Sequence, residues 1–447
     1  METTAPTPQS SRWAPPFFTI WTGQAISLFG SQLIQFALIW WLTKSTGSAT
    51  VLATAALVGL LPQVILGPII GTLVDRWNRR IIMILADSVI ALSTLGLVFL
   101  FWSGQVGIWQ IYLLMFIRST AGGFHWPAMQ ASTSLMVPKE HLARIQGLNQ
   151  MLQGGMNIVS APLGAVLLEF MTVQGILAID IGTALVAILP LFFIAVPQPK
   201  PNGSAKGADG KTPFWQDFRL GLRYMFGWPG LVIIAIMAAL INLLLNPAFA
   251  LAPILVTQHF DGGAIQLAWL ESILGVGVIA GGILLSVWGG FKRRILTSML
   301  GLLGLGVGCL LVGFTPATAY PLALAATFVI GFSMPITNGP LLAAVQAVVA
   351  PEMQGRVFTL IGSAAAAMSP LGLIIAGPVA DAFGVQTWFV IGGVVTLMMG
   401  VAGFFIPAVV HLEDGRGEEI AAPVEQPALG ANPVVSAVDG VVSIDGD

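Results

Sequence analysis

Four ionisable residues, Arg118, His125, Asp180 and Glu271, lie inside long apolar runs of this sequence. A charged side chain at the centre of a membrane-spanning helix costs about 2.5–3.5 kcal/mol, so such residues usually serve ion or substrate pathways. Carboxyl and imidazole groups also exchange protons in many binding sites. We therefore interpret His125, Asp180 and Glu271 as candidates for proton coupling, and Arg118 as an intramembrane charge with a function. A structural anchor for Arg118, a packing role for His125 and simple interfacial or pore-lining polarity for the two acids remain as alternatives.

Side-chain amides form a second group of polar residues in the apolar runs. In a membrane protein such amides either line a polar cavity or join helices by hydrogen bonds, and the sequence favours neither role. The cavity candidates are Gln24, Gln32, Gln35, Asn157, Asn242 and Asn246.

A charged connection with the sequence GTLVDRWNRR separates two of the apolar runs. A topology signal explains Arg80, because Lys and Arg collect in the loops that stay in the cytoplasm. It does not explain Asp75, nor two glycines whose spacing of four suits close helix packing. We interpret the segment as a gate that locks one conformation, and Asp87 lies close enough along the chain to pair with its arginines. The gating set is Gly67, Gly71, Asp75, Arg76, Arg79 and Arg80.

Several other kinds of chemistry are excluded by the residues that are missing. The sequence has no paired histidine ligands and no G-x-S-x-G motif, so we expect no metal, no cofactor and no enzyme activity. Gly210-Lys211-Thr212 imitates the end of a phosphate loop, but Ala205 stands where its first glycine is required. Cys309 is the single cysteine, which rules out a disulfide framework. No basic stripe indicates nucleic-acid binding.

The elements that position these residues follow from composition. Hydrophobic residues make up 56% of the chain and charged residues only 9%, against a usual soluble average of about 25% charged. A spanning helix needs about 20 mainly apolar residues. Twelve runs meet this requirement, near 17–42, 50–74, 81–103, 107–131, 145–170, 174–196, 230–257, 265–289, 295–314, 319–347, 357–381 and 386–408. The sequence predicts an all-α integral membrane protein with twelve transmembrane helices in two bundles of six.

Breaks in the apolar pattern divide the chain into five parts. Pro, Gly, Lys and Asp collect at 197–213, which predicts a loop, and Phe214 to Trp228 has the pattern of an interfacial helix. The acidic C-terminal segment has no sustained periodicity, which predicts disorder. The predicted parts are an N-terminal segment 1–16, a six-helix bundle 17–196, a linker 197–228, a second six-helix bundle 229–410 and a tail 411–447.

Positive charge is distributed unevenly over the predicted connections. Arginines and lysines collect on alternate connections, and only Lys44 lies on the opposite side. Since short positively charged loops are retained in the cytoplasm, both termini and the tail are predicted to be cytoplasmic, in a multi-pass protein of the cell membrane.

The second half resembles the first when it is shifted by 212–214 residues. Arg79-Arg80-Ile81 then matches Arg293-Arg294-Ile295, and Pro127 matches Pro340. Six helices per half give both copies the same membrane orientation, so these are parallel repeats. Such repeats suit two bundles that rock about a central cavity opened alternately to each side. Gly331 is the counterpart of Arg118, so the repeats are not chemically equivalent.

Several segments resemble the major facilitator superfamily. The connection from Gly71 to Arg80 resembles the loop signature between its second and third helices, with Asn78 where glycine is usual. Asn tolerates the left-handed backbone that such a turn uses. The run Arg118 to Gly122 resembles the pattern of its fourth helix, and Trp21 to Ala25 with Val58 to Asp75 resembles the macrolide-efflux proteins of its drug:proton antiporter branch.

This resemblance implies a secondary active transporter that exports amphiphilic, macrolide-like or drug-like molecules in exchange for protons. It implies protons and a small amphiphilic substrate as partners and a proton gradient as the energy source, and for Arg118 it points to proton coupling or cavity electrostatics. The composition already predicts a lipid bilayer as the surroundings. Because two six-helix halves can enclose a cavity, we expect a monomer to suffice as the working unit. Export of a siderophore or a lipid remains open, as does, less favoured, a passive pore or a transport-like membrane receptor.

Overall fold

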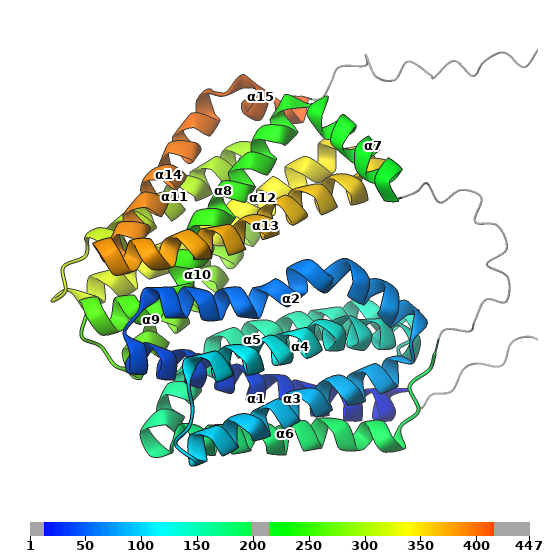
Figure 1. Cartoon of the computed structure of the whole chain (residues 1–447). Helices are drawn as coiled ribbons and strands as arrows, with labels where there is room; N and C mark the ends of the chain where they lie inside the picture. Colours follow the sequence, from blue (N-terminus) through cyan, green and yellow to red (C-terminus); the bar gives the residue numbers. More distant parts are fainter. Residues whose placement is uncertain (1–12, 199–213, 415–447) are drawn as a thin grey trace, which may run out of the picture. The chain divides into compact units, whose positions relative to one another are not determined.

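The computed structural model describes residues 13–198 and 214–414, and Figure 1 traces their helices in chain order. The predicted disorder of the tail and most of the predicted central loop fall outside these described residues. The structure also does not describe the side chains of Asp75, Arg76 and Asn157 or the surroundings of Gly71. The first six long helices are α1 (Ala14–Thr46), α2 (Ala49–Arg76), α3 (Arg79–Trp102), α4 (Ile108–Met136), α5 (Leu142–Phe170) and α6 (Val173–Phe193).

The second half begins with α7 (Phe214–Phe226), the helix at the predicted interfacial segment. One predicted helix, near 230–257, was wrong in its extent. The helix α8 ends at Ala250 and a π-helical turn at Leu255–His259 follows, because Pro253 lacks the N–H that would continue the ladder. The other helices are α8 (Pro229–Ala250), α9 (Ala252–Ile254), α10 (Ala264–Trp288), α11 (Arg294–Phe314), α12 (Tyr320–Val348), α13 (Pro351–Phe383), α14 (Val385–Phe405) and α15 (Pro407–Val410).

Eleven helices in the described part of the chain are long and apolar enough to cross a membrane. A bilayer core offers no water to backbone N–H and C=O groups, so a spanning segment must satisfy them within its own helix. The long helix that is not among the eleven is α4, which carries Arg118 and His125. The prediction of an all-α integral membrane protein is confirmed, while the exact number of spanning helices stays a prediction.

Each half packs around its own helix pairs. In the first half α1 packs on α5 and α6, and α3 packs on α4 and α6. In the second half α11 packs on α12 and α14, while α10 packs on α12 and α8 on α13. The cores are built from fully buried aliphatic side chains such as Leu38, Leu97 and Leu302. The bundles are therefore joined internally by dry helix–helix contacts.

Between the halves, α2 packs on α13 and α5 packs on α10. These contacts are reciprocal, because the second helix of each repeat meets the fifth helix of the other, as in a two-fold interface. Asp381 of α13 closes the first contact. Its carboxylate accepts hydrogen bonds from the Ser48 hydroxyl at 2.9 Å and from the backbone N–H groups of Ala49 at 2.6 Å and Thr50 at 3.0 Å. It thereby caps α2 with a negative charge at the positive end of the helix.

Candidate functional site

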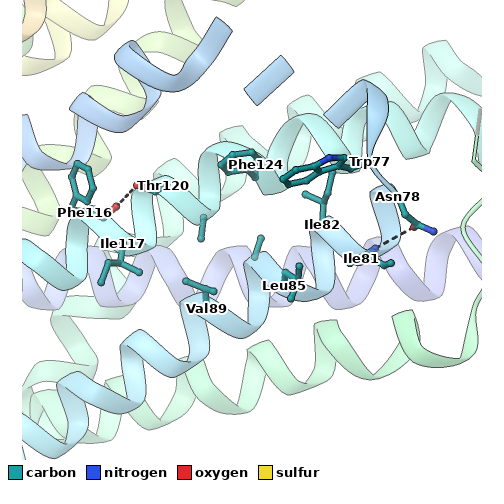
Figure 2. Close-up of a pocket in the computed structure, with 12 residues that line it drawn as sticks. Trp77, Asn78, Ile81, Ile82, Leu85, Val89, Phe116, Ile117, Thr120 and Phe124 are labelled. Atoms are coloured by element: carbon teal, nitrogen blue, oxygen red, sulfur yellow. Dashed lines mark hydrogen bonds between the residues drawn. The ribbon is translucent and has the colours of Figure 1, made fainter. Parts of the chain in front are cut away.

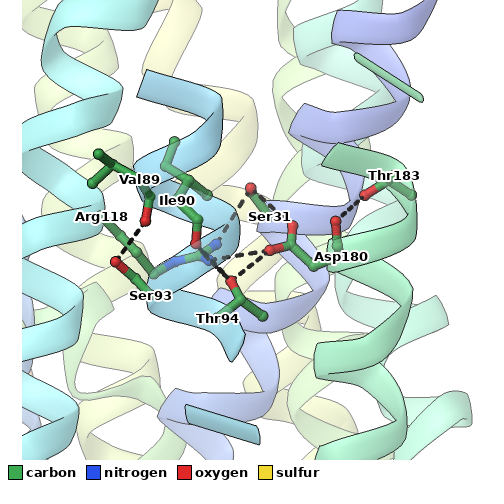
Figure 3. A network of polar contacts seen from close by, with 8 residues as sticks. All are labelled: Ser31, Val89, Ile90, Ser93, Thr94, Arg118, Asp180 and Thr183. Carbon is green, nitrogen blue, oxygen red and sulfur yellow. Dashed lines mark hydrogen bonds and ion pairs between the residues drawn. The ribbon is translucent and has the colours of Figure 1, made fainter. Parts of the chain in front are cut away.

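A buried ion pair joins α4 to α6. The Arg118 Nη1 atom lies 3.1 Å from Asp180 Oδ2, and the Asp180 side chain is fully buried. The Thr94 hydroxyl donates to the same oxygen at 2.8 Å, and the Ser31 hydroxyl donates to Asp180 Oδ1 at 3.1 Å. Figure 3 shows these groups converging from four helices. We call Ser31, Thr94, Arg118 and Asp180 the Arg118 layer.

The Arg118 layer is saturated with hydrogen bonds. The guanidinium also donates to the Ile90 carbonyl at 3.4 Å and to the Ser31 hydroxyl at 3.3 Å, and it contacts the Thr94 hydroxyl. A buried charge is tolerated when it is paired and its remaining polar atoms are bonded. Both oxygens of Asp180 and both terminal nitrogens of Arg118 meet this condition.

A second polar cluster joins α1, α3 and α4. The Gln24 amide donates to Asp87 Oδ2 at 3.0 Å, and His125 Nε2 lies 2.7 Å from Gln24 Oε1 and 3.3 Å from Asp87 Oδ1. Since two acceptor oxygens converge on Nε2, that nitrogen carries a hydrogen. All three side chains are buried. We call Gln24, Asp87 and His125 the His125 layer.

The two layers repeat at a spacing of seven residues on three helices. Gln24 and Ser31 lie on α1, Asp87 and Thr94 on α3, and His125 and Arg118 on α4. Seven residues are two helical turns, so the layers are separated by about 10 Å along the helix axes. The layers differ chemically. One layer is built on a guanidinium paired with a carboxylate, and the other on an imidazole beside a carboxylate and an amide.

Both layers border a cavity of about 500 Å³ in the first half, the N cavity. Asp87, Arg118 and His125 contribute to its wall, and Gln24 lies at its buried end. Its other polar lining residues are Ser27, Ser31, Gln32, Gln35, Gln63 and Ser119. The structure therefore brings together Arg118, His125 and Asp180 with three of the six predicted cavity amides.

A second cavity, of about 540 Å³, lies mainly among helices of the second half, and we call it the C cavity. Its wall is almost entirely apolar, with Gly154 and Ile158 of α5 completing it. Glu271 is its one acidic lining residue, and no described residue donates a hydrogen bond to the Glu271 carboxylate. Thr327 is the other polar side chain in the wall.

Two of the remaining predicted amides, Asn242 and Asn246, line neither the N nor the C cavity. Asn246 donates to Asn242 Oδ1 at 2.9 Å and to the Ser369 hydroxyl at 2.6 Å, and Asn242 donates to the Ala238 carbonyl. The bond to Ser369 joins α8 to α13, whereas the other two lie within α8. Of the two roles that the sequence left open, the structure therefore shows helix joining for Asn246.

The predicted gate differs in two details from its expected geometry. Asn78 has an extended backbone, with φ −68° and ψ 111°, and its side chain caps α3 by accepting from the N–H groups of Arg80 and Ile81. The prediction of a left-handed backbone at Asn78 is therefore wrong. An asparagine at the N-cap of a helix adopts backbone angles of the β region. The close helix approach expected at Gly67 is also absent, since an added methyl group there would meet no atom within 4 Å.

The described arginines of this loop bind backbone carbonyls of two other helices. Arg79 Nη1 donates to the Ala131 carbonyl of α4 at 2.8 Å, and Arg80 donates to the Phe192 carbonyl at 2.7 Å and to the Leu191 carbonyl in the last turn of α6. The contacts of Arg80 are favourable because a positive group at the last carbonyls of a helix offsets the negative end of its dipole. This geometry ties the α2–α3 connection to α4 and α6.

Sequence reasoning missed two groupings. Asp87 was expected near the arginine loop, but its oxygens meet Gln24 and His125, which lie 63 residues before it and 38 residues after it. Its place inside an apolar run was the available signal. The contact of Asp381 was also missed, because its three donors lie more than 330 residues away and no local spacing reveals them.

Comparison with known proteins places this geometry in a family. The sequence profile of the Major Facilitator Superfamily matches residues 20–373 and 231–438. Macrolide efflux protein A of Streptococcus pyogenes is 33% identical over 391 residues, which cover 88% of this chain and 96% of that protein. The multidrug efflux pump Tap of Mycolicibacterium fortuitum is 26% identical, with 86% of this chain and 94% of Tap covered.

Solved structures agree on the fold. A bacterial homologue of the human lysosomal transporter Spinster, solved in an inward-facing conformation, gives a TM-score of 0.68 at 15% identity and covers 91% of this chain and 99% of that one. The nucleoside transporter NupG gives 0.60 at 14% identity, over 87% and 98%. At such identities the likeness concerns the fold alone. With the profile match and the 33% identity, it follows that this multi-pass membrane protein belongs to the Major Facilitator Superfamily, a family of transporters.

Proposed function

We propose that the chain exports amphiphilic small molecules, with macrolides as the first class to test, in exchange for protons. It does so across the cytoplasmic membrane as a monomer, with both termini in the cytoplasm. Three features support this proposal. Two efflux proteins are among its relatives, positive charge collects on one set of connections, and two cavities of about 500 and 540 Å³ are of a size that suits drug-like ligands.

The observation that carries the proton part is the His125 layer. Asp87 and His125 can both exchange a proton, and they meet beside the N cavity. Adding a proton to Asp87 turns one acceptor oxygen into a donor, which rearranges the bonds that tie α1 to α3 and α4. The charge of this pair then changes with its access to either side, whereas Arg118 supplies a fixed positive charge two turns away. Glu271 is a second proton-exchange candidate in the C cavity.

Alternating access accounts for the contacts between the halves. The Asp381 cap on α2 and the α5–α10 contact hold the two bundles together at the ends that the charge distribution places outside. Substrate then enters from the cytoplasm, and opening of these contacts releases it outside. The gating residues Asp75, Arg76, Arg79 and Arg80 act at the opposite end, where the family resemblance places a lock.

Accumulation of labelled erythromycin in a pump-deficient bacterial host tests the proposal. Expression of the chain is expected to lower accumulation, and a protonophore is expected to abolish the effect. In proteoliposomes, Asp87→Asn is expected to reduce pH-gradient-driven transport at least tenfold while exchange of labelled for unlabelled substrate persists. Glu169→Gln, which changes an exposed acid on α5, is the matched control and is expected to behave as the parent.

Two outcomes would redirect the proposal. Unchanged erythromycin accumulation in well-expressing cells would exclude macrolides as the substrate class, and siderophores and lipids would be tested next. Full gradient-driven transport by Asp87→Asn would remove the His125 layer from coupling and leave Glu271 or Asp180 as the proton carrier.

A further inference from the structure

A deep apolar groove of about 690 Å³ runs along the junction of α3 and α4. Figure 2 shows Trp77, Asn78 and Phe124 at one end, with Val89, Phe116 and Ile117 toward the other. The groove lies on the face of these helices opposite to the N cavity, since Ala86 and Ala121 line the groove while their neighbours Asp87 and Gly122 line the cavity. We call it the Trp77 groove.

The lining of the Trp77 groove offers almost nothing to a polar ligand. Its two polar side chains other than the indole are already bonded to backbone, Asn78 to the start of α3 and Thr120 to the Phe116 carbonyl at 2.8 Å. Ile81 and Leu85 on its rim are 53% and 58% exposed. On a membrane-spanning helix such exposed aliphatic side chains face lipid chains. The occupant must therefore be a hydrocarbon.

The length of the groove corresponds to one leaflet of a bilayer. Along α3 it extends over twelve residues, from Asn78 to Val89, and the eleven steps between them span about 16 Å at the helical rise. The hydrocarbon core is about 30 Å thick, so one leaflet contributes about 15 Å. A groove of this length takes a single acyl chain that runs from the headgroup region to the bilayer centre.

The end at Trp77 has the features of a headgroup region. Tryptophan is enriched at membrane–water interfaces, and Trp77 is exposed beside the polar Asn78. Arg80 lies two residues along the chain from Asn78 and is not part of the groove lining. Its guanidinium is held by the Leu191 and Phe192 carbonyls at the end of α6, and no carboxylate of the described residues pairs with it. Fixed basic groups next to a groove between helices attract anionic lipid headgroups.

We propose that the Trp77 groove is a binding site for one anionic phospholipid, with an acyl chain between α3 and α4 and its phosphate beside Arg80. A lipid bound there supports the outer face of the two helices that carry Asp87, Arg118 and His125. The proposal concerns lipid binding and does not depend on export, so each can fail without the other.

Bromine-labelled lipids test the proposal without altering the groove. In nanodiscs, the fluorescence of Trp77 is obtained as the difference between the parent protein and Trp77→Phe. Acyl chains of phosphatidylglycerol that carry bromine are expected to quench this fluorescence at a mole fraction at least fivefold lower than phosphatidylcholine with the same chains. Equal quenching by both lipids, in proportion to their mole fractions, would overturn the proposal.

Native mass spectrometry of the detergent-purified full chain provides the second test. The double variant Ala86→Leu/Ala121→Leu fills the groove at its two buried alanines and is expected to reduce retained phosphatidylglycerol at least fivefold. The control is Leu95→Phe, at an exposed position of α3 outside the groove, which is expected to leave the retained lipid unchanged. Arg80→Gln is expected to remove the preference for phosphatidylglycerol over phosphatidylcholine. Unaltered retention in the double variant, or stoichiometric displacement of the lipid by erythromycin, would assign the groove to another occupant.

Discussion

The two halves differ in the space that corresponding helices leave beside their glycines. In the first half an added methyl group at Gly59 or Gly122 would meet nothing within 4 Å, so this half is the more open one at these positions. The α2–α4 pair is nevertheless joined by the Ser119 hydroxyl, which donates to the Gly59 carbonyl at 2.5 Å. In the second half the α10–α12 pair is closely packed, since a methyl group at Gly331 would clash with the Leu274 carbonyl oxygen and one at Gly281 would clash with the Phe332 carbonyl oxygen.

This contrast explains how the polar residues are distributed. Gly331 is the repeat counterpart of Arg118, so the position that holds a charge in one half holds a close backbone contact in the other. Two polar layers need room between helices and therefore lie in the open half. The second half keeps one acid, Glu271, in an apolar cavity. We infer that the first half carries most of the buried charged side chains, while the second half provides closely packed apolar helices.

The largest effect is expected from Arg118→Ala. It leaves Asp180 buried without its charge partner, which costs about 3–5 kcal/mol. We expect a strong loss of thermal stability in detergent and no gradient-driven transport. The double variant Arg118→Ala/Asp180→Asn is expected to recover part of the stability but not the transport. If the single variant keeps the parental melting temperature, the Arg118 layer does not hold the first half together.

A smaller loss is expected from Gly331→Ala, which forces α10 and α12 apart. Overpacking of this kind costs about 1–3 kcal/mol. The matched change Gly122→Ala adds the same methyl group to the open half, where the structure has space for it. Melting temperatures of the two variants measure the contrast directly, and equal values would show that the halves do not differ in packing.

Asp381→Ala removes the carboxylate that caps α2 from the other half. Loss of an N-terminal cap costs about 0.5–2 kcal/mol, and 1.4 kcal/mol is a tenfold change in an equilibrium. We expect the population in which the halves meet at this contact to fall several-fold, as measured by spin-label distances between α2 and α13. Asp381→Asn keeps an acceptor oxygen and is expected to lie between the parent and Asp381→Ala. Identical distance distributions in all three proteins would rule out a role for the cap.

The smallest effect on stability is expected from Glu271→Gln. No described residue bonds to this carboxylate, so the isosteric amide is expected to shift the melting temperature by no more than about 1–2 °C. Affinity for cationic substrates, measured by competition binding, is expected to fall because the one acid of the C cavity is gone. A large loss of stability would reveal a structural partner and would remove the contrast with Asp180.

The sequence by itself determined the class of protein and nearly all helix positions. The run predicted near 295–314 is α11 at Arg294–Phe314, and the run near 107–131 corresponds to α4 at Ile108–Met136. This success has a physical cause. Lipid forces each spanning segment to satisfy its own backbone hydrogen bonds, so helix position depends on local composition. The sequence also singled out Arg118, because the cost of an intramembrane charge is a local property, but it did not show that Asp180 is its partner.

Only the tertiary structure decided which side chains meet. Asp87 with His125, and Asp381 with the start of α2, join residues on different helices, and a helical pattern gives the face of a residue but not the neighbour that it meets. The same limit applies to glycine, since Gly67 faces open space while Gly331 touches a carbonyl. Such contacts depend on how helices cross, and many crossings are compatible with one apolar pattern. The sequence therefore determined the helices, and their packing determined the site.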